Sequence, residues 1–140
     1  MEITGSYTVS QDISTVISLS SDMTKIAPCL KGVTQVEKLT PENLIGRIKV
    51  SVGIVKGTFD LNATVKKLSE DSIELMLKLK GTLGTAEGVI VVKASNLQGK
   101  TQLTWKGDVE LKGLAANIGK SLVEQVSNSL VEEIYKCLFR

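Results

Sequence analysis

Hydrophobic and polar residues alternate along most of the chain between residues 32 and 112. The most regular stretch is 73–80, where isoleucine or leucine occupies every odd position and a charged residue or methionine every even one. Side chains of a β-strand point alternately to its two faces, so this period predicts a strand with one apolar face. Six such stretches, separated by turn-forming residues as at 40–43 and 70–72, predict an antiparallel sheet with one face in water. Residues 2–9 predict a seventh, N-terminal strand.

The alternation changes phase at residues 53–57, which read GIVKG. Apolar residues before this point have even numbers (Ile48, Val50), and those after it have odd numbers (Phe59, Leu61). Such a phase change indicates a turn or a bulge, and glycine supplies the backbone freedom for either. The sequence therefore predicts a hairpin, with Gly57 at a positive φ angle and Gly53 at a bulge.

Three segments carry helical patterns instead. Ile13, Val16 and Ile17 have the spacing of an amphipathic helix behind Asp12, which suits its N-terminus, and a second short helix is predicted from Ser21 to a point before Pro28. The segment from residue 114 to 139 predicts a helix of roughly 25 residues, about 38 Å long, that covers the apolar face of the sheet. Its apolar residues recur every four positions: Ile118, Leu122, Val126, Leu130, Ile134 and Leu138.

Composition excludes several classes of protein. The 140 residues are 42% hydrophobic and 23% charged, which predicts one folded domain spanning 1–140. No apolar run approaches the roughly 20 residues of a membrane helix, and the N-terminus does not resemble a secretory signal. A net charge of +2 with 4% aromatic residues gives no footprint for nucleic acid.

The chain has no histidine and two cysteines, Cys29 and Cys137. This argues against histidine-based catalytic triads and most zinc sites, and no metal or cofactor is predicted. A disulfide between the two cysteines is one interpretation, but their unrelated contexts favour two buried free thiols and a cytoplasmic protein.

The order of elements resembles the helix-grip fold of the START and birch-pollen-allergen-like superfamily, and within it the CoxG family of carbon monoxide dehydrogenase subunits. GIVKG at 53–57 is similar to that family's glycine-proline-x-lysine-glycine hairpin, with Ile54 in place of proline. CLKGV at 29–33 is similar to its cysteine-aliphatic-proline-glycine motif, with Lys31 in place of proline. In KGLAANIG at 112–119, Gly113, Ala116 and Gly119 match its approach to the long helix.

The resemblance implies an α+β helix-grip fold. A curved seven-stranded antiparallel sheet would wrap around a long C-terminal helix, with two short helices after strand 1. Several relatives continue past the long helix with a hydrophobic tail that anchors them in the membrane. Because this chain stops at Arg140, we expect membrane contact, if any, to be peripheral at the inner face of the cell membrane or mediated by a partner.

The inward-facing residues are the candidates for a binding site. A packed core is the ordinary interpretation of apolar stripes, but a curved sheet gripping one helix leaves a gap, and concave apolar pockets bind small ligands. Together with the resemblance, this predicts a ligand cavity, in which Trp105 stacks on the ligand or has a polar partner in the core. The predicted ligand-binding residues are Ile48, Val50, Leu61, Ala63, Leu75, Leu77, Trp105, Ile118, Leu122 and Val126.

The function expected from these observations is non-enzymatic binding of a lipid or quinone. By resemblance, the protein would recruit a molybdenum-containing carbon monoxide dehydrogenase, or a related hydroxylase, to the membrane or connect it with the quinone pool. A polyketide cyclase or aromatase is one alternative, although the inward faces carry almost no group that could move a proton. An adaptor with a solid core is the other.

Overall fold

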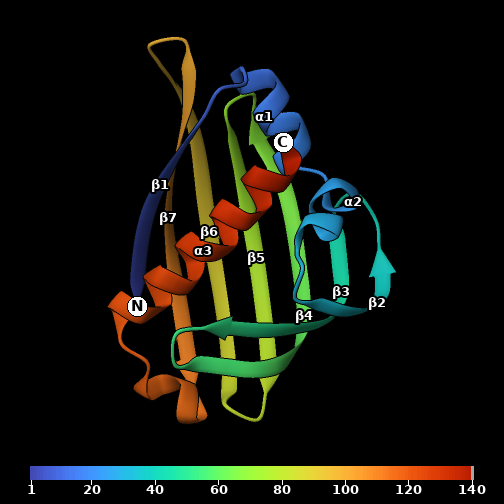
Figure 1. The fold of residues 1–140 in the computed structure, drawn as a ribbon, viewed down its shortest axis with the longest axis vertical. Coiled ribbons are helices and arrows are strands. Elements are labelled where there is room, and N and C mark those ends of the chain that lie inside the picture. Colours follow the sequence, from blue (N-terminus) through green and yellow to red (C-terminus); the bar gives the residue numbers. More distant parts are fainter. Residues whose placement is uncertain (140) are drawn as a thin grey trace.

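Seven antiparallel strands form one sheet that curves around the C-terminal helix (Figure 1). The computed structural model describes residues 1–139, so Arg140, at which the sequence analysis placed the end of the chain, lies outside the described residues. The strands are β1 (Glu2–Val9), β2 (Val33–Leu39), β3 (Asn43–Val52), β4 (Val55–Ser69), β5 (Ser72–Gly81), β6 (Gly84–Leu97) and β7 (Lys100–Lys112). The helices are α1 (Ile13–Ser20), α2 (Met23–Ile26) and α3 (Lys120–Leu138), with 3-10 turns η1 (Ala27–Cys29) and η2 (Gly113–Asn117).

The strand order is β1-β7-β6-β5-β4-β3-β2. Each strand from β2 to β7 pairs with its successor through a short turn, while β1 pairs with β7 at one edge. The chain crosses from β1 to the opposite edge through α1 and α2, which close one end of the space between α3 and the sheet (Figure 1). The predicted helix-grip architecture is therefore confirmed.

The short helices differ from the prediction in one cap. Asp12 caps α1 by accepting a hydrogen bond from the Thr15 backbone N–H at 2.8 Å. The predicted start of α2 at Ser21 is wrong, because Ser21 ends α1 and its hydroxyl donates to the Ile17 carbonyl at 2.7 Å. Asp22 caps α2 instead, since its carboxylate accepts from the Thr24 N–H at 2.9 Å.

The C-terminal helix is shorter than the sequence predicts, with 19 residues rather than roughly 25. Residues 113–117 form η2, and Ile118 lies between η2 and α3. The backbone of η2 is tied to the sheet, because the Ala115 N–H donates to the Leu83 carbonyl in the β5–β6 turn at 2.6 Å. Gly113 makes the bend out of β7 with a φ of 73°.

The β3–β4 hairpin turns one step earlier than predicted. Val52 pairs with Val55, so Gly53 and Ile54 form a two-residue loop, and Gly53 has a φ of 57°. Glycine at the first loop position is typical of a type II′ hairpin. Gly57 pairs with Val50 inside β4 and is not among the glycines with positive φ, so its predicted role in the turn is wrong.

Substitution of Gly53 tests this turn. We expect Gly53→Val to lower the free energy of unfolding by about 1–3 kcal/mol, because a β-branched residue is strained at positive φ. Gly53→Asn is the matched control and should cost less, since asparagine tolerates this conformation and a Cβ at this position meets nothing within 4 Å. Equal thermal midpoints for the two variants would contradict the assigned turn.

Candidate functional site: an apolar cavity under the sheet

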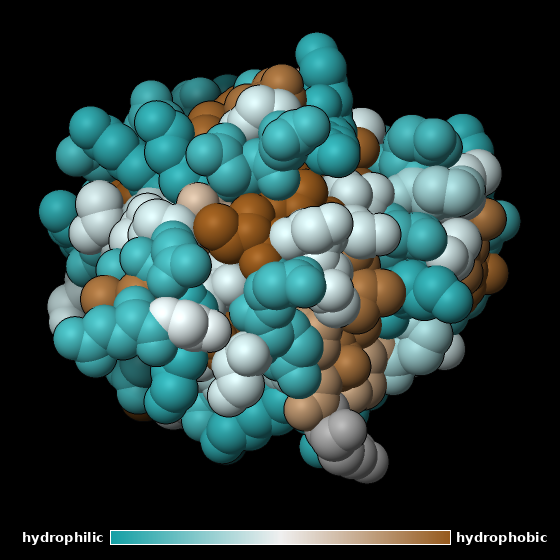
Figure 2. All heavy atoms as spheres, turned by 90° about the horizontal axis from the view of Figure 1, so that it is seen from above, coloured by the Kyte–Doolittle hydropathy of each residue, from teal (hydrophilic) through white to brown (hydrophobic). Residues whose placement is uncertain are grey.

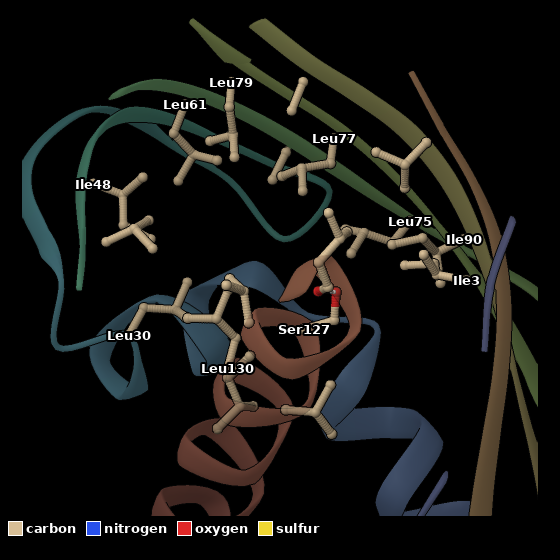
Figure 3. A pocket seen from close by; sticks show the side chains of 18 of the residues that line it. Ile3, Leu30, Ile48, Leu61, Leu75, Leu77, Leu79, Ile90, Ser127 and Leu130 are labelled. Atoms are coloured by element: carbon tan, nitrogen blue, oxygen red, sulfur yellow. Dashed lines mark hydrogen bonds between the residues drawn. The ribbon is translucent and has the colours of Figure 1, made fainter. Parts of the chain in front are cut away.

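A cavity of about 290 Å³ lies between the concave face of the sheet and α3 (Figure 3). Leucines of β5, including Leu75, Leu77 and Leu79, project into it from the sheet, and Ser127 and Leu130 of α3 face them from the other side (Figure 3). Its walls are almost entirely apolar. This volume is near the lower end of the range for small-molecule pockets, roughly 300–1,000 Å³.

The structure brings nine of the ten predicted ligand-binding residues to the wall of this cavity. Ile48 and Val50 come from β3, Leu61 and Ala63 from β4, Leu75 and Leu77 from β5, Trp105 from β7, Ile118 from the η2–α3 junction and Val126 from α3. Leu122 is the exception: it packs against the core, but the neighbouring Val123 lines the cavity in its place.

The displacement from Leu122 to Val123 follows from the period of the helix. The cavity-lining residues of α3 recur with the ordinary spacing near 3.6. They are Val123, Val126, Ser127, Leu130, Val131, Ile134 and Tyr135. A strict step of four drifts around the helix, so it leaves this face at its N-terminal end.

Two aromatic residues lie against the sheet because each faces a glycine on the neighbouring strand. Trp105 pairs with Gly5 of β1, and a Cβ on Gly5 would lie 2.2 Å from Cζ2 of the indole. Phe59 pairs with Gly81 of β5, where a Cβ would lie 2.8 Å from Cδ1 of the ring. The glycines therefore make room for the rings at the wall, and the two largest inward-facing side chains of the strands do not need to fill the gap.

Contacts near both ends of α3 hold the helix over the cavity. Near its N-terminus, the Glu124 carboxylate accepts a hydrogen bond from the Thr4 N–H of β1 at 2.9 Å. Near its C-terminus, the Glu133 carboxylate accepts from the Lys31 N–H at 3.2 Å, just after η1. The part of α3 between these contacts covers the cavity.

A disulfide between Cys29 and Cys137 reinforces the second attachment, and it corrects the prediction of two free thiols. The sulfur atoms are 2.05 Å apart, and the bond joins η1 to the last turn of α3 across 108 residues of sequence. The sequence analysis missed this pair because the cysteines meet only after the chain has traversed the whole sheet. The inference of a cytoplasmic protein from free thiols loses its basis accordingly.

The most buried polar pair at the cavity is Ser20 with Tyr135, whose hydroxyl groups are 2.7 Å apart. Burial raises the pKa of the Tyr135 phenol, and the smaller opposing effect comes from the Ser20 hydrogen bond. The phenol is therefore uncharged at neutral pH. Tyr135 also stacks between Tyr7 and Phe139, with ring centroids 6.0 Å apart in both pairs.

Sequence reasoning missed both members of this pair. Tyr135 follows Ile134 and lies four residues after Val131, so a helical period of 3.6 would have placed it on the inward face. Ser20 carried no such signal, since a serine at the end of an amphipathic helix is ordinarily exposed.

The wall offers little chemistry beyond these hydroxyls. The cavity-lining residues within 1–139 include no carboxylate, amine or thiol group, and their polar members are Ser20, Thr85, Ser127 and Tyr135. In the same part of the chain no group of three or more potential ligands could hold a metal ion. Among these residues, no helix is both long and apolar enough to cross a bilayer. Such a site can enclose an apolar molecule and offers no evident general acid or base pair.

A curved antiparallel sheet that grips a C-terminal helix defines a START-like helix-grip protein. Residues 5–140 match the model of the CoxG family, which is described as a subunit of carbon monoxide dehydrogenase. The chain belongs to this family, which confirms the resemblance inferred from its motifs. No curated protein matches it in sequence.

Solved structures with the same fold cover nearly the whole chain. A conserved protein from Geobacillus kaustophilus has a TM-score of 0.82 at 21% identity, over 99% of this chain and 92% of that one. A START superfamily protein from Mycobacterium smegmatis has a TM-score of 0.63 at 20% identity, over 98% and 93% of the two chains. The Zhui aromatase/cyclase from Streptomyces sp. R1128 has a TM-score of 0.57 at 13% identity, over 98% and 87%. At these identities the likeness shows the fold alone.

Proposed function

We propose that this protein is a non-enzymatic carrier that binds a lipid or a quinone between its sheet and α3. The observation that carries the proposal is the cavity, with a volume of about 290 Å³ and almost wholly apolar walls. Transfer of apolar surface out of water drives binding of such molecules. The hydroxyls of Ser20 and Tyr135 provide a polar group at which a quinone oxygen or a lipid headgroup could be oriented.

Membership of the CoxG family supports a partner for this carrier. The family's description names a subunit of carbon monoxide dehydrogenase. We assign the chain the corresponding role of serving a molybdenum-containing dehydrogenase, by bringing it to the membrane or connecting it with the quinone pool. The cargo would then be an electron acceptor or a lipid that marks the membrane.

The aromatase/cyclase among the structural neighbours keeps an enzymatic function as the alternative. That neighbour shares the fold at 13% identity, and the cavity here lacks a carboxylate or amine that could move a proton. A solid-core adaptor, the remaining alternative, has no use for the cavity. Both observations support the carrier over the other two functions.

Extraction of the purified protein tests the proposal. Protein expressed in a bacterial host should release a lipid or quinone, near one molecule per chain, on organic extraction and mass spectrometry. A fluorescent fatty acid should bind the extracted protein and be displaced by that molecule. Clean extracts from folded protein that also fails to bind the fatty acid would contradict the proposal.

A further inference from the structure

One end of the molecule, here called the basic end, consists of the β3–β4 turn (53–54), the β5–β6 turn (82–83) and η2. The three segments touch: the Ala115 N–H donates to the Leu83 carbonyl at 2.6 Å, and a Cβ on Gly57 would lie 3.3 Å from Leu83 Cδ1. They lie at the bottom of Figure 1, remote from α1 and the β6–β7 turn.

The two most exposed large hydrophobic side chains of residues 1–139 are both at the basic end. Ile54 is 87% exposed in the β3–β4 turn and Leu114 is 65% exposed in η2. Neither side chain packs in the core, and a two-residue hairpin does not require isoleucine at this position. Exposed apolar residues at loop tips commonly mark a surface that contacts a partner or a membrane.

Lysines surround these tips. Residues 49–59, 80–86 and 111–123 contain five lysines and no aspartate or glutamate. The lysines are Lys49, Lys56, Lys80, Lys112 and Lys120, and all five are exposed.

The flanking carboxylates lie beyond these segments, and three have partners. Asp60 pairs with Arg47 at 3.2 Å, Glu110 pairs with Lys112 at 3.6 Å, and Glu124 accepts from the Thr4 N–H at 2.9 Å. The Lys112 pair is exposed on both sides, so it neutralises little of the charge.

The opposite end has the reverse character. Its loops at 9–13, 68–72 and 95–101 carry Asp12, Glu70 and Asp71 against one lysine, Lys100. Seen from above, this end is hydrophilic over most of its rim, around a smaller apolar group (Figure 2). The small net charge of the chain therefore conceals a separation of charge along its long axis.

We infer that the basic end docks on an anionic lipid surface, with Ile54 and Leu114 inserted at the interface and the lysines at the headgroups. Apolar insertion combined with basic residues is the usual means by which proteins bind peripherally to anionic membranes. The same three segments supply Val55, Leu83 and Ala115 to the cavity wall. Docking in this orientation places one end of the cavity next to the bilayer, which suits a carrier that exchanges cargo with it; this part rests on the proposed function.

Flotation with vesicles tests the inference. Wild-type protein should float with vesicles of 70% phosphatidylcholine and 30% phosphatidylglycerol, and about tenfold less with phosphatidylcholine alone. The double variant Ile54→Asp/Leu114→Asp should lose at least tenfold in partition to the anionic vesicles. The matched control is Leu97→Asp, a 42% exposed leucine next to the β6–β7 turn at the opposite end, which should float like wild type.

A second pair of variants separates the charge from the apolar contact. Removing one lysine charge with Lys56→Gln should weaken partition roughly fivefold, and Lys56→Gln/Lys120→Gln correspondingly more. Lys100→Gln at the opposite end is the control and should have no effect. Added salt should reduce binding of wild type to anionic vesicles.

Failure of docking and failure of cargo binding are distinguishable, because fatty-acid binding by the variants is measured without vesicles. Retained fatty-acid binding with lost flotation supports the docking surface. Equal flotation of wild type and Ile54→Asp/Leu114→Asp would overturn it. Wild-type protein that ignores anionic vesicles would also overturn it, and would leave the basic end for an acidic protein partner.

Discussion

Replacing Cys29 and Cys137 by serine is expected to lower the free energy of unfolding by about 4 kcal/mol. The disulfide closes a loop across 108 residues, so it removes a large number of conformations from the unfolded chain. A loop of this length is at the upper end of the usual range, roughly 2–4 kcal/mol with larger values for long loops. For a domain of this size the loss corresponds to a fall of roughly 10–20 °C in the thermal midpoint.

Reduction of the wild type supplies the control. A reductant should lower the midpoint of wild-type protein toward that of Cys29→Ser/Cys137→Ser and leave the double variant unchanged. The loss should be accompanied by weaker fatty-acid binding, because the bond fixes the C-terminal end of α3 to η1 beside the cavity. A wild type that melts at the same temperature with and without reductant would show that the bond does not form in solution.

The sheet was predictable because its signals are local. Alternation with a period of two marks each strand, and glycine or polar residues mark each turn, so strand order follows from short antiparallel connections. The turn at Gly53 shows the limit of this approach. Two glycines four residues apart both fit a turn, and only the pairing of Val52 with Val55 decides between them.

The features that were not predictable depend on contacts between distant segments. Cys29 and Cys137 meet across 108 residues, and η2 replaces the first turns of the expected helix because Ala115 bonds to Leu83. The sequence around residue 115 is compatible with a helix. The sheet offers that backbone a partner, which the local pattern does not reveal.

The candidate site was predictable in its residues but not in its openness. Alternation identifies which side chains face inward, and most of them line the cavity. Whether they meet across the gap depends on the curvature of the sheet and on pairs such as Trp105 with Gly5 and Phe59 with Gly81. These pairs can be recognised only once the register between strands is known.

Leu77 is the position at which a filled core and an open cavity differ most. It projects into the cavity from the middle of β5 (Figure 3), and its neighbours across the sheet are the small residues Ala63 and Gly88. In a filled core, Leu77→Trp would destabilise the protein by roughly 1–3 kcal/mol through overpacking. Here we expect a change within about 1 kcal/mol, since the indole has space, together with at least tenfold weaker fatty-acid binding.

The opposite substitution completes the test. Leu77→Ala should cost about 1–2 kcal/mol, below the roughly 2–5 kcal/mol typical of leucine in a closed core, because the cavity already exists. Ile17→Ala is the matched control: Ile17 is 1% exposed in α1 and lies outside the cavity wall, so its truncation should cost the full amount. Chemical denaturation measures stability and fatty-acid titration measures binding. If both Leu77 variants lose as much stability as Ile17→Ala and the wild type binds nothing, the cavity does not serve as a ligand site and the protein has a solid core.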